Sequence, residues 1–116
     1  GALTVPLTAM LQGTTLSISA PDSPAHGPLE ASVVVLALSK TETVTVERGE
    51  NAGRTISYHN IVRSIHPAGI WNGVAQRWQF DLSSIRDARV NGYVVLLQVM
   101  KDDKPGMILG GAKVGI

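Results

Sequence analysis

The sequence predicts an all-β fold, an antiparallel β-sandwich of about seven or eight strands. Two strongly apolar runs, residues 31–38 and 92–100, have the length of strands and are rich in valine and leucine. Shorter runs alternate apolar and polar residues, as half-buried strands do. Prolines and glycines separate the runs at intervals typical of a sandwich, and no stretch has the pattern of a long helix. We therefore expect a single domain of immunoglobulin-like character.

The first expected elements form a hairpin near the N-terminus. Residues 3–7 and 14–19 alternate in polarity, and Gly13 lies between them, so they predict two paired strands joined by a turn. Pro6 lacks a backbone N–H group, which favours an edge position for the first strand. Residues 20–28 contain three prolines and one glycine, and this composition predicts a loop.

The middle of the chain predicts further strands. Residues 31–38 are apolar at both parities, which predicts a central strand covered on both faces, and three consecutive valines favour a strand over a helix. After an expected turn at Lys40, residues 43–46 alternate valine and threonine like a half-buried strand. Residues 55–66 alternate in the same way.

The C-terminal part holds the remaining elements. Residues 65–73 are interrupted by proline and glycine and predict an irregular segment, whereas residues 76–82 predict a strand with its aromatic residues inward. Residues 83–89 predict one helical turn capped by a serine, and the second apolar strand, a turn and a return strand follow. The residues that we expect in the core are Val33, Val35, Leu36, Tyr58, Val62, Trp78, Phe80, Val95 and Leu97.

The composition excludes several classes of function. The formal net charge is +1, so no strong field predicts a nucleic-acid or membrane-surface partner. The chain has no cysteine, which excludes disulfides, thiolate metal sites and thiol redox chemistry within it. No apolar run has the length of a membrane span, so we expect no membrane insertion. Histidine spacings typical of metal sites and glycine-rich phosphate loops are absent, and we expect neither metal nor cofactor.

The segment from Arg48 to Arg63 is the main candidate for function, because it gathers three arginines and a glutamate in a chain that is otherwise mostly apolar. Asn51 and the glycine two residues later predict a tight turn. One hypothesis is structural: Glu50, which lies between Arg48 and Arg54, pairs with them and holds the loop together. The alternative is an anion site, since guanidinium groups bind carboxylate or phosphate. We favour the structural hypothesis because Glu50 neutralises part of the charge.

Strand parity suggests two further binding candidates. His59 and Arg63 are four residues apart on the same face of the expected strand, a spacing that would suit a binding surface or proton exchange near neutral pH. The alternative is a solvated strand face. Trp71, between two glycines, is the aromatic residue that we expect to be exposed as a platform for a sugar ring, because Trp78 fits the core alternation.

The polar segment also carries a resemblance to a known family. Residues 48–55, followed by residues 58–63, resemble the C-terminal part of the secreted bacterial proteins grouped as domain of unknown function 1223. Residues 69–73 and 108–112 fit the same pattern in the same order. The resemblance spans nearly the whole chain.

The resemblance implies a particular setting for the chain. In that family a β domain follows a thioredoxin-like domain that carries a pair of cysteines and an export signal. This chain has neither, so it resembles the β part alone, and we expect a processed or excised part of an exported, periplasmic or secreted protein. The resemblance implies a suspected redox role for the parent protein, outside this chain, and no established activity for the β domain.

Three functional hypotheses follow. The leading one is a non-enzymatic accessory domain that packs against a thioredoxin-like domain, with the segment from Arg48 to Arg63 at the contact. The second is a small-ligand or glycan-binding module that uses Arg54, His59, Arg63 and Trp71. The third is a hydrolase or isomerase with His59 as base and Glu50 as its orienting partner. We rank it last, because a histidine and a carboxylate in one segment are a weak indication of catalysis.

Overall fold

The computed structural model describes residues 5–23, 30–45, 55–85, 87–101 and 104–115. For residues 40–45, 55–60 and 101 it describes the backbone but not the side chains. The strands are β1 (Thr8–Gln12), β2 (Thr15–Ala20), β3 (Ala31–Thr45), β4 (Thr55–Trp71), β5 (Gln76–Asp81), β6 (Gly92–Lys101) and β7 (Lys104–Val114). A short 3-10 helix, η2 (Leu82–Ile85), follows β5.

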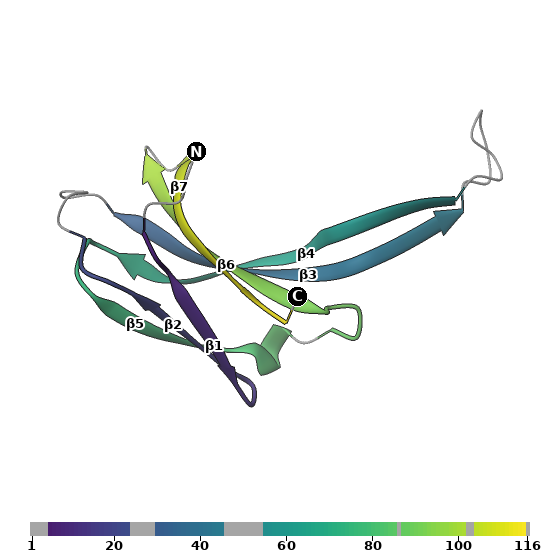
Figure 1. Ribbon diagram of the computed structural model, residues 1–116, viewed down its shortest axis with the longest axis horizontal. Coiled ribbons are helices and arrows are strands. Elements are labelled where there is room, and N and C mark those ends of the chain that lie inside the picture. Colours follow the sequence, from purple (N-terminus) through teal and green to yellow (C-terminus); the bar gives the residue numbers. More distant parts are fainter. Residues whose placement is uncertain (1–4, 24–29, 46–54, 86, 102–103, 116) are drawn as a thin grey trace.

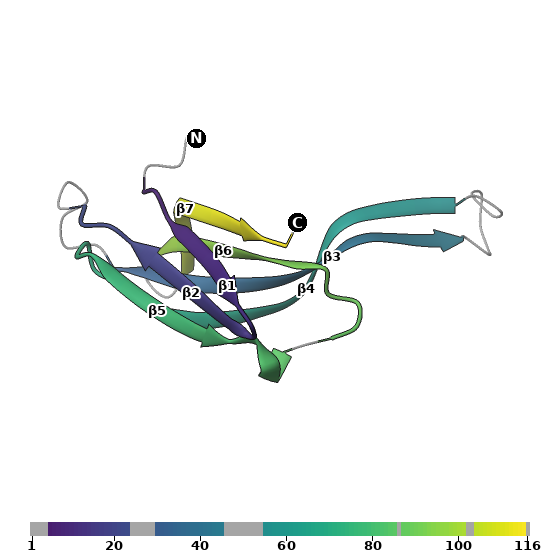
Figure 2. The same ribbon diagram turned by 60° about the horizontal axis from the view of Figure 1, so that its bottom comes forward.

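The strands form two packed sheets. One sheet has three strands in the order β1-β2-β5, and the other has four in the order β4-β3-β6-β7. All pairings between these strands are antiparallel. Figure 2 shows the three-stranded sheet in front of the four-stranded one. This arrangement confirms the predicted antiparallel sandwich of immunoglobulin-like character.

The N-terminal hairpin is confirmed, but its first strand begins later than expected. Gln12 pairs with Thr15, and Gly13 has a φ of 61°, so a two-residue turn joins β1 and β2. Residues 5–7, which the alternation placed in that strand, precede it. They lie beside β7 instead, where the Val5 backbone N–H donates to the Leu109 carbonyl oxygen at 2.8 Å.

β3 and β4 are longer than expected. The predicted turn at Lys40 does not form, because β3 continues to Thr45 and pairs with β4 over almost its whole length. The predicted interruption at residues 65–73 is also wrong, since β4 runs through Pro67 to Trp71. β4 is an edge strand, and a proline whose missing N–H would face away from the sheet is tolerated there. Two register shifts, between Val33 and Val34 and between Ala37 and Leu38, absorb the irregularity as bulges.

The core lies between the two sheets and confirms most of the predicted members. Val33, Val35, Trp78, Val95 and Leu97 are buried, and Phe80 packs against them. Leu36 is half-buried, and the side chain of Tyr58 lies outside the described residues. The other buried members of the core cluster are Val5, Leu7, Leu16, Ile18, Ala20, Ala31, Trp71, Leu82 and Leu109.

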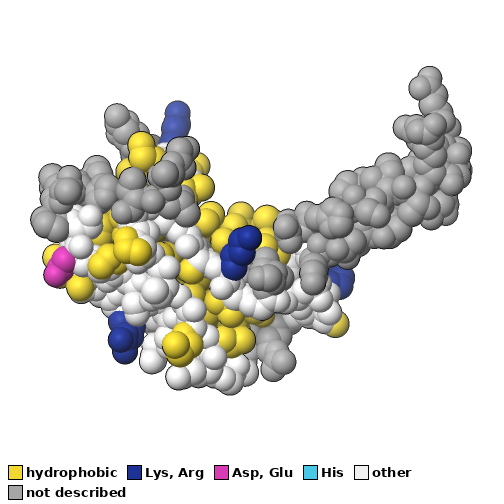
Figure 3. All heavy atoms as spheres, viewed as in Figure 1, with side chains coloured by type: hydrophobic (Ala, Val, Ile, Leu, Met, Phe, Trp, Pro, Cys, Tyr) yellow, Lys and Arg dark blue, Asp and Glu magenta, His cyan; other side chains and the backbone are white. Residues whose placement is uncertain are grey.

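The prediction that Val62 belongs to the core is wrong, because its side chain is 48% exposed. Ser64 lies opposite Ala37 and Val62 opposite Leu38, so Arg63 is the extra residue of a bulge. One extra residue moves the side chains that precede it in the strand to the opposite face of the sheet. The alternation of apolar and polar residues in the sequence does not reveal such a shift. Figure 3 shows hydrophobic side chains on the surface between β7 and the long β3–β4 extension.

Two glycines allow close packing of the core. Trp78 lies directly on Gly69, and a Cβ atom at residue 69 would overlap the indole ring. Gly110 approaches the Val5 carbonyl oxygen in the same way, so a Cβ atom at residue 110 would overlap that oxygen.

The helical turn expected at residues 83–89 is shorter and begins earlier. It is η2, and its start is capped by Asp81 rather than by a serine: the Ser83 backbone N–H donates to Asp81 Oδ1 at 2.9 Å, and the Leu82 N–H donates to the Thr14 carbonyl oxygen at 2.8 Å. No helix in the described part of the chain is long and apolar enough to cross a membrane.

β3 and β4 extend beyond the rest of the sandwich as a two-stranded ribbon (Figure 1). β3 pairs with β6 only from Ala31 to Leu38, whereas residues 39–45 pair with residues 55–61 of β4 alone. We call these two stretches the β3–β4 arm. The radius of gyration is 16.9 Å, larger than the roughly 13 Å expected for a compact domain of this length.

Candidate functional site

A polar pocket lies at the root of the β3–β4 arm, and we call it the Arg63 pocket. It has a volume of about 370 Å³. β4, η2 and the segment between η2 and β6 provide its walls. Its lining residues are Arg63, Ser64, His66, Ser84, Ile85, Asp87, Arg89 and Val90.

Arg63 reaches this pocket because of the bulge in β4. Its Nε donates to Ser39 Oγ at 2.6 Å, and Ser39 Oγ donates in turn to the Arg89 carbonyl oxygen at 3.0 Å. Ser39 is only 2% exposed, so these bonds satisfy a hydroxyl that is closed off from water. The chain of hydrogen bonds ties β3, β4 and the segment before β6 together at the point where the arm leaves the sandwich.

His66 occupies the inner side of the same pocket. It pairs with the buried Val35, and its Nε2 lies 2.8 Å from Ser64 Oγ. Its ring also packs near Phe80, with 6.0 Å between ring centroids. The imidazole is therefore held between a hydroxyl and the edge of the aromatic core.

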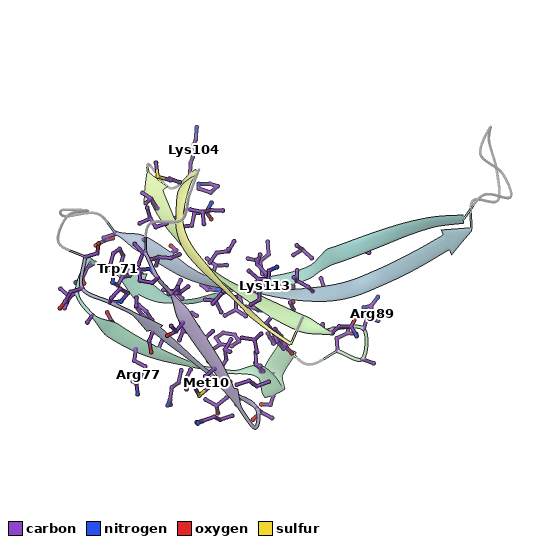
Figure 4. All side chains as sticks on the ribbon, in the orientation of Figure 1. Met10, Trp71, Arg77, Arg89, Lys104 and Lys113 are labelled. Atoms are coloured by element: carbon purple, nitrogen blue, oxygen red, sulfur yellow. The ribbon has the colours of Figure 1, made fainter. Side chains whose placement is uncertain are left out.

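Asp87 and Arg89 form an ion pair at the mouth of the pocket. Arg89 Nη2 lies 3.1 Å from Asp87 Oδ2, and the Arg89 backbone N–H donates to Asp87 Oδ1 at 2.8 Å. Hydrogen bonds from the side chain and backbone of Arg89 lower the pKa of Asp87 from 3.8 to about 2, and the charge of Arg63 contributes. Figure 4 shows Arg89 below the root of the arm. The carboxylate offsets part of the arginine charge, so the pocket is polar rather than strongly basic.

The structure tests only part of the predicted site. Arg48, Glu50, Asn51 and Arg54 lie outside the described residues, so the tight turn and the arginine–glutamate pairs remain predictions. The backbone of His59 pairs with Thr41 in the arm, and its side chain is not among those described. Arg63 is the predicted site residue that the structure places in the pocket, and it lies there with His66.

The expectation that Trp71 is an exposed aromatic platform is wrong. Its side chain is 0% exposed, and its indole Nε1 donates to the Pro21 carbonyl oxygen at 3.2 Å. Trp71 lies opposite the buried Ala31 on the inner side of β4, and Figure 4 shows it inside the sandwich. A sugar ring therefore cannot stack on it.

Several residues of the pocket were missed by sequence reasoning. The spacing of Asp87 and Arg89 is a local signal that could have predicted their pair, since a short polar side chain often accepts from the N–H two residues later. Ser39 gave no such signal, because its partners are 24 and 50 residues away. Among the described residues, no group of three histidine, aspartate or glutamate side chains could hold a metal ion.

A second hollow lies on the outer side of the three-stranded sheet. It has a volume of about 420 Å³, and hydroxyl and amide side chains line it together with Met10 and Arg77. The polar residues around it are Thr8, Gln12, Ser17, Ser19 and Gln79. These are side chains expected on a strand face that is in contact with water.

Comparison with known proteins shows a family and a fold. Residues 2–98 match the model of the family described as "Protein of unknown function (DUF1223)". A crystal structure of a protein from Agrobacterium tumefaciens is similar to the chain, with a TM-score of 0.78 and 24% sequence identity. That match covers 97% of this chain and 46% of the Agrobacterium chain, so this chain spans less than half the length of that protein. None of the curated proteins compared with the chain matches it.

Proposed function

The chain belongs to the DUF1223 family of proteins of unknown function, and we propose that it is a non-catalytic interaction domain that packs against a companion domain in a longer polypeptide. The β3–β4 arm is the observation that carries this proposal. Over residues 39–45 and 55–61, each strand of the arm pairs only with the other among the described residues.

The physical argument is that an isolated two-stranded ribbon is marginally stable in water. Its outer N–H and C=O groups are also open to pairing with other chains. An arm of this kind is stabilised when it lies against another surface. The sequence between its two strands contains Arg48, Glu50 and Arg54, and arginine is enriched at recognition surfaces.

The companion domain that the family resemblance implies is thioredoxin-like, and the parent protein would then be exported to the periplasm or secreted. The Agrobacterium relative supports a longer polypeptide, since more than half of its chain lies outside the match. This chain contains no cysteine, so any thiol chemistry of the parent protein would reside in the companion domain.

Hydrogen exchange tests the proposal. We expect backbone amides of residues 41–45 and 55–60 to exchange at least about ten times more slowly in the longer polypeptide than in this chain alone, because a covered ribbon opens less often. Amides in the centre of β2 serve as the control and should differ little between the two samples. Equal exchange of the arm in both samples would contradict an interaction role for it.

A second candidate function is the binding of a small anion in the Arg63 pocket. The favouring observation is that Arg63 and Arg89 line one cavity with two serine hydroxyls, a set of donors suited to carboxylate or phosphate. Titration of this chain with inorganic phosphate and with acetate, followed by NMR, should shift the Ser64 and Arg89 amides. The same titration of Arg63→Ala should leave them unchanged, and identical responses of both proteins would exclude specific binding.

A further inference from the structure

The outer face of the four-stranded sheet is unusually apolar. Cross-strand pairs place Ile65, Leu36 and Val94 in one row and Pro67, Val34 and Leu96 in the next. Ile70 extends the same face in a row whose central residues, Ser32 and Gln98, are polar, and Ile65 and Ile70 are 63% and 58% exposed. Residues that lie opposite each other in a sheet point to the same side, so these side chains form one continuous surface.

The central strands explain why this surface needs a cover. Residues 31–38 of β3 and most of β6 are apolar at both parities, a pattern typical of strands that are buried on both faces. Their inner residues, such as Val35 and Leu97, are buried against the three-stranded sheet. Val34 and Leu96 point the other way, and no described element packs over them. The sequence therefore predicts a second layer that the described part of this chain does not supply.

The area of the face indicates which kind of partner, a separate chain or a tethered domain, can bind it. Four strands about 4.8 Å apart and five residues of about 3.4 Å each give a face of about 300 Å² in projection. Stable dimers between separate chains bury about 800 Å² per partner. Interfaces between domains of one chain begin near 600 Å² in total, about 300 Å² on each side. A tethered domain needs less area because the linker keeps its local concentration high.

The position of the N-terminal segment also favours a domain of the same polypeptide over a separate chain. Val5 pairs with Leu109 along the outer edge of β7, beside Ile108 on the outer face. Any polypeptide that precedes Val5 reaches the sandwich at an edge of this apolar surface. The Agrobacterium relative has more than half of its chain outside the match, which is enough for a second domain.

We propose that the outer face of the four-stranded sheet is the surface on which the companion domain docks, and that the companion contributes an apolar surface with few charges. The charged residue on this face is Lys113, which lies opposite Val94. Charged groups of a partner that became buried against the face would therefore lose their hydration without gaining opposite charges in return. The inference rests on the proposed function and names the contact surface on this chain.

The test is a pair of matched lysine substitutions in the longer polypeptide. Ile65→Lys alters the apolar face, and Met10→Lys alters the polar face of the other sheet; the two native side chains are 63% and 62% exposed. We expect Ile65→Lys to raise hydrogen exchange at the interface about ten-fold or more, because it places an unpaired charge there. Met10→Lys should leave it unchanged. The thermal unfolding midpoint of each variant in this chain alone shows that both still fold.

The outcomes separate this inference from the proposed function. One outcome is that hydrogen exchange of the arm is slowed in the longer polypeptide, but Ile65→Lys and Met10→Lys have the same effect on exchange. The domain contact would then stand, and the outer face of the four-stranded sheet would be ruled out as the contact surface. If the longer polypeptide is a dimer that Ile65→Lys dissociates, as measured by light scattering, a second copy covers the face and the inference is again overturned. Increased exchange with Ile65→Lys alone, in a monomer, supports it.

Discussion

The two outer faces of the sandwich have the same secondary structure and opposite chemistry. On the three-stranded sheet, pairing places these residues outward: Thr8, Met10, Gln12, Thr15, Ser17, Ser19, Arg77, Gln79 and Asp81. Met10 is the sole apolar residue among them. On the four-stranded sheet, the outward rows consist mainly of valine, leucine and isoleucine. Figure 3 shows exposed hydrophobic side chains between β7 and the arm, and others lower in the view on the side of the three-stranded sheet.

This difference supports the proposed function, in which one face is in contact with water and a companion domain covers the other. A face with one methionine among hydroxyl, amide and charged groups is normal for a sheet in contact with solvent. A continuous apolar sheet face marks an interaction site or an aggregation hazard. The apolar face and the β3–β4 arm belong to the same sheet, so one companion domain could contact both.

The largest expected effect comes from two neighbouring leucines in β6. Leu97 is 0% exposed on the inner side, and Leu96 lies half-buried on the outer face. In this chain alone we expect Leu97→Ala to lower the free energy of unfolding by about 2–5 kcal/mol, because it leaves a cavity. Leu96→Ala should lower it by about 1 kcal/mol or less. Urea unfolding measures both, and equal losses would show that the two faces are not different in burial.

The next effect compares neighbouring residues of β4. Gly69→Ala pushes a methyl group into the Trp78 ring and should lower the free energy of unfolding by about 1–3 kcal/mol. Ile70→Ala, on the outer face, should change it by about 0.5 kcal/mol in this chain alone. Tryptophan fluorescence follows unfolding in urea for both variants. A harmless Gly69→Ala would show that the packing of Trp78 against β4 is not tight.

The smallest effect is the dependence of stability on pH at Asp87, which belongs to neither face. Its folded pKa is about 2 and its ordinary value is 3.8, so the ionised group stabilises the fold above pH 4. This contribution disappears as the pH falls from about 4 to about 2. Asp87→Asn should therefore lower stability at pH 7 and have no effect below pH 2, as urea unfolding at several pH values would show. A difference that persists well below pH 2, where Asp87 is protonated in the folded protein, would rule out the ion pair as its cause.

The sequence was sufficient to predict the fold class, because apolar runs and turn residues are local signals. The two apolar strands became β3 and β6, and the alternation around Trp78 became β5. The bulge at Arg63 could not be predicted, because an extra residue is defined only by the partner strand. This single irregularity accounts for the wrong assignment of Val62.

The candidate site was less predictable than the fold. Arg63 stood out by its charge, but its hydrogen-bonding partner Ser39 lies on another strand and resembles any other serine in the sequence. Trp71 seemed exposed because glycines flank it, whereas its pairing with Ala31 turns it into the core. The most useful signal was the apolar pattern on both parities of residues 31–38. It predicted that both faces are covered, and the described part of the chain covers one of them.

Thiol labelling at single introduced cysteines measures directly whether the apolar face is covered, since this chain has no cysteine of its own. Ile65→Cys lies on the apolar face and Gln79→Cys on the polar face, and peptide mass spectrometry locates the label at each position. We expect both to react rapidly in this chain alone. In the longer polypeptide, labelling of Ile65→Cys should slow at least about ten-fold while Gln79→Cys is unchanged, because only the apolar face is covered. Equal labelling of Ile65→Cys in both proteins would show that no companion domain covers the apolar face.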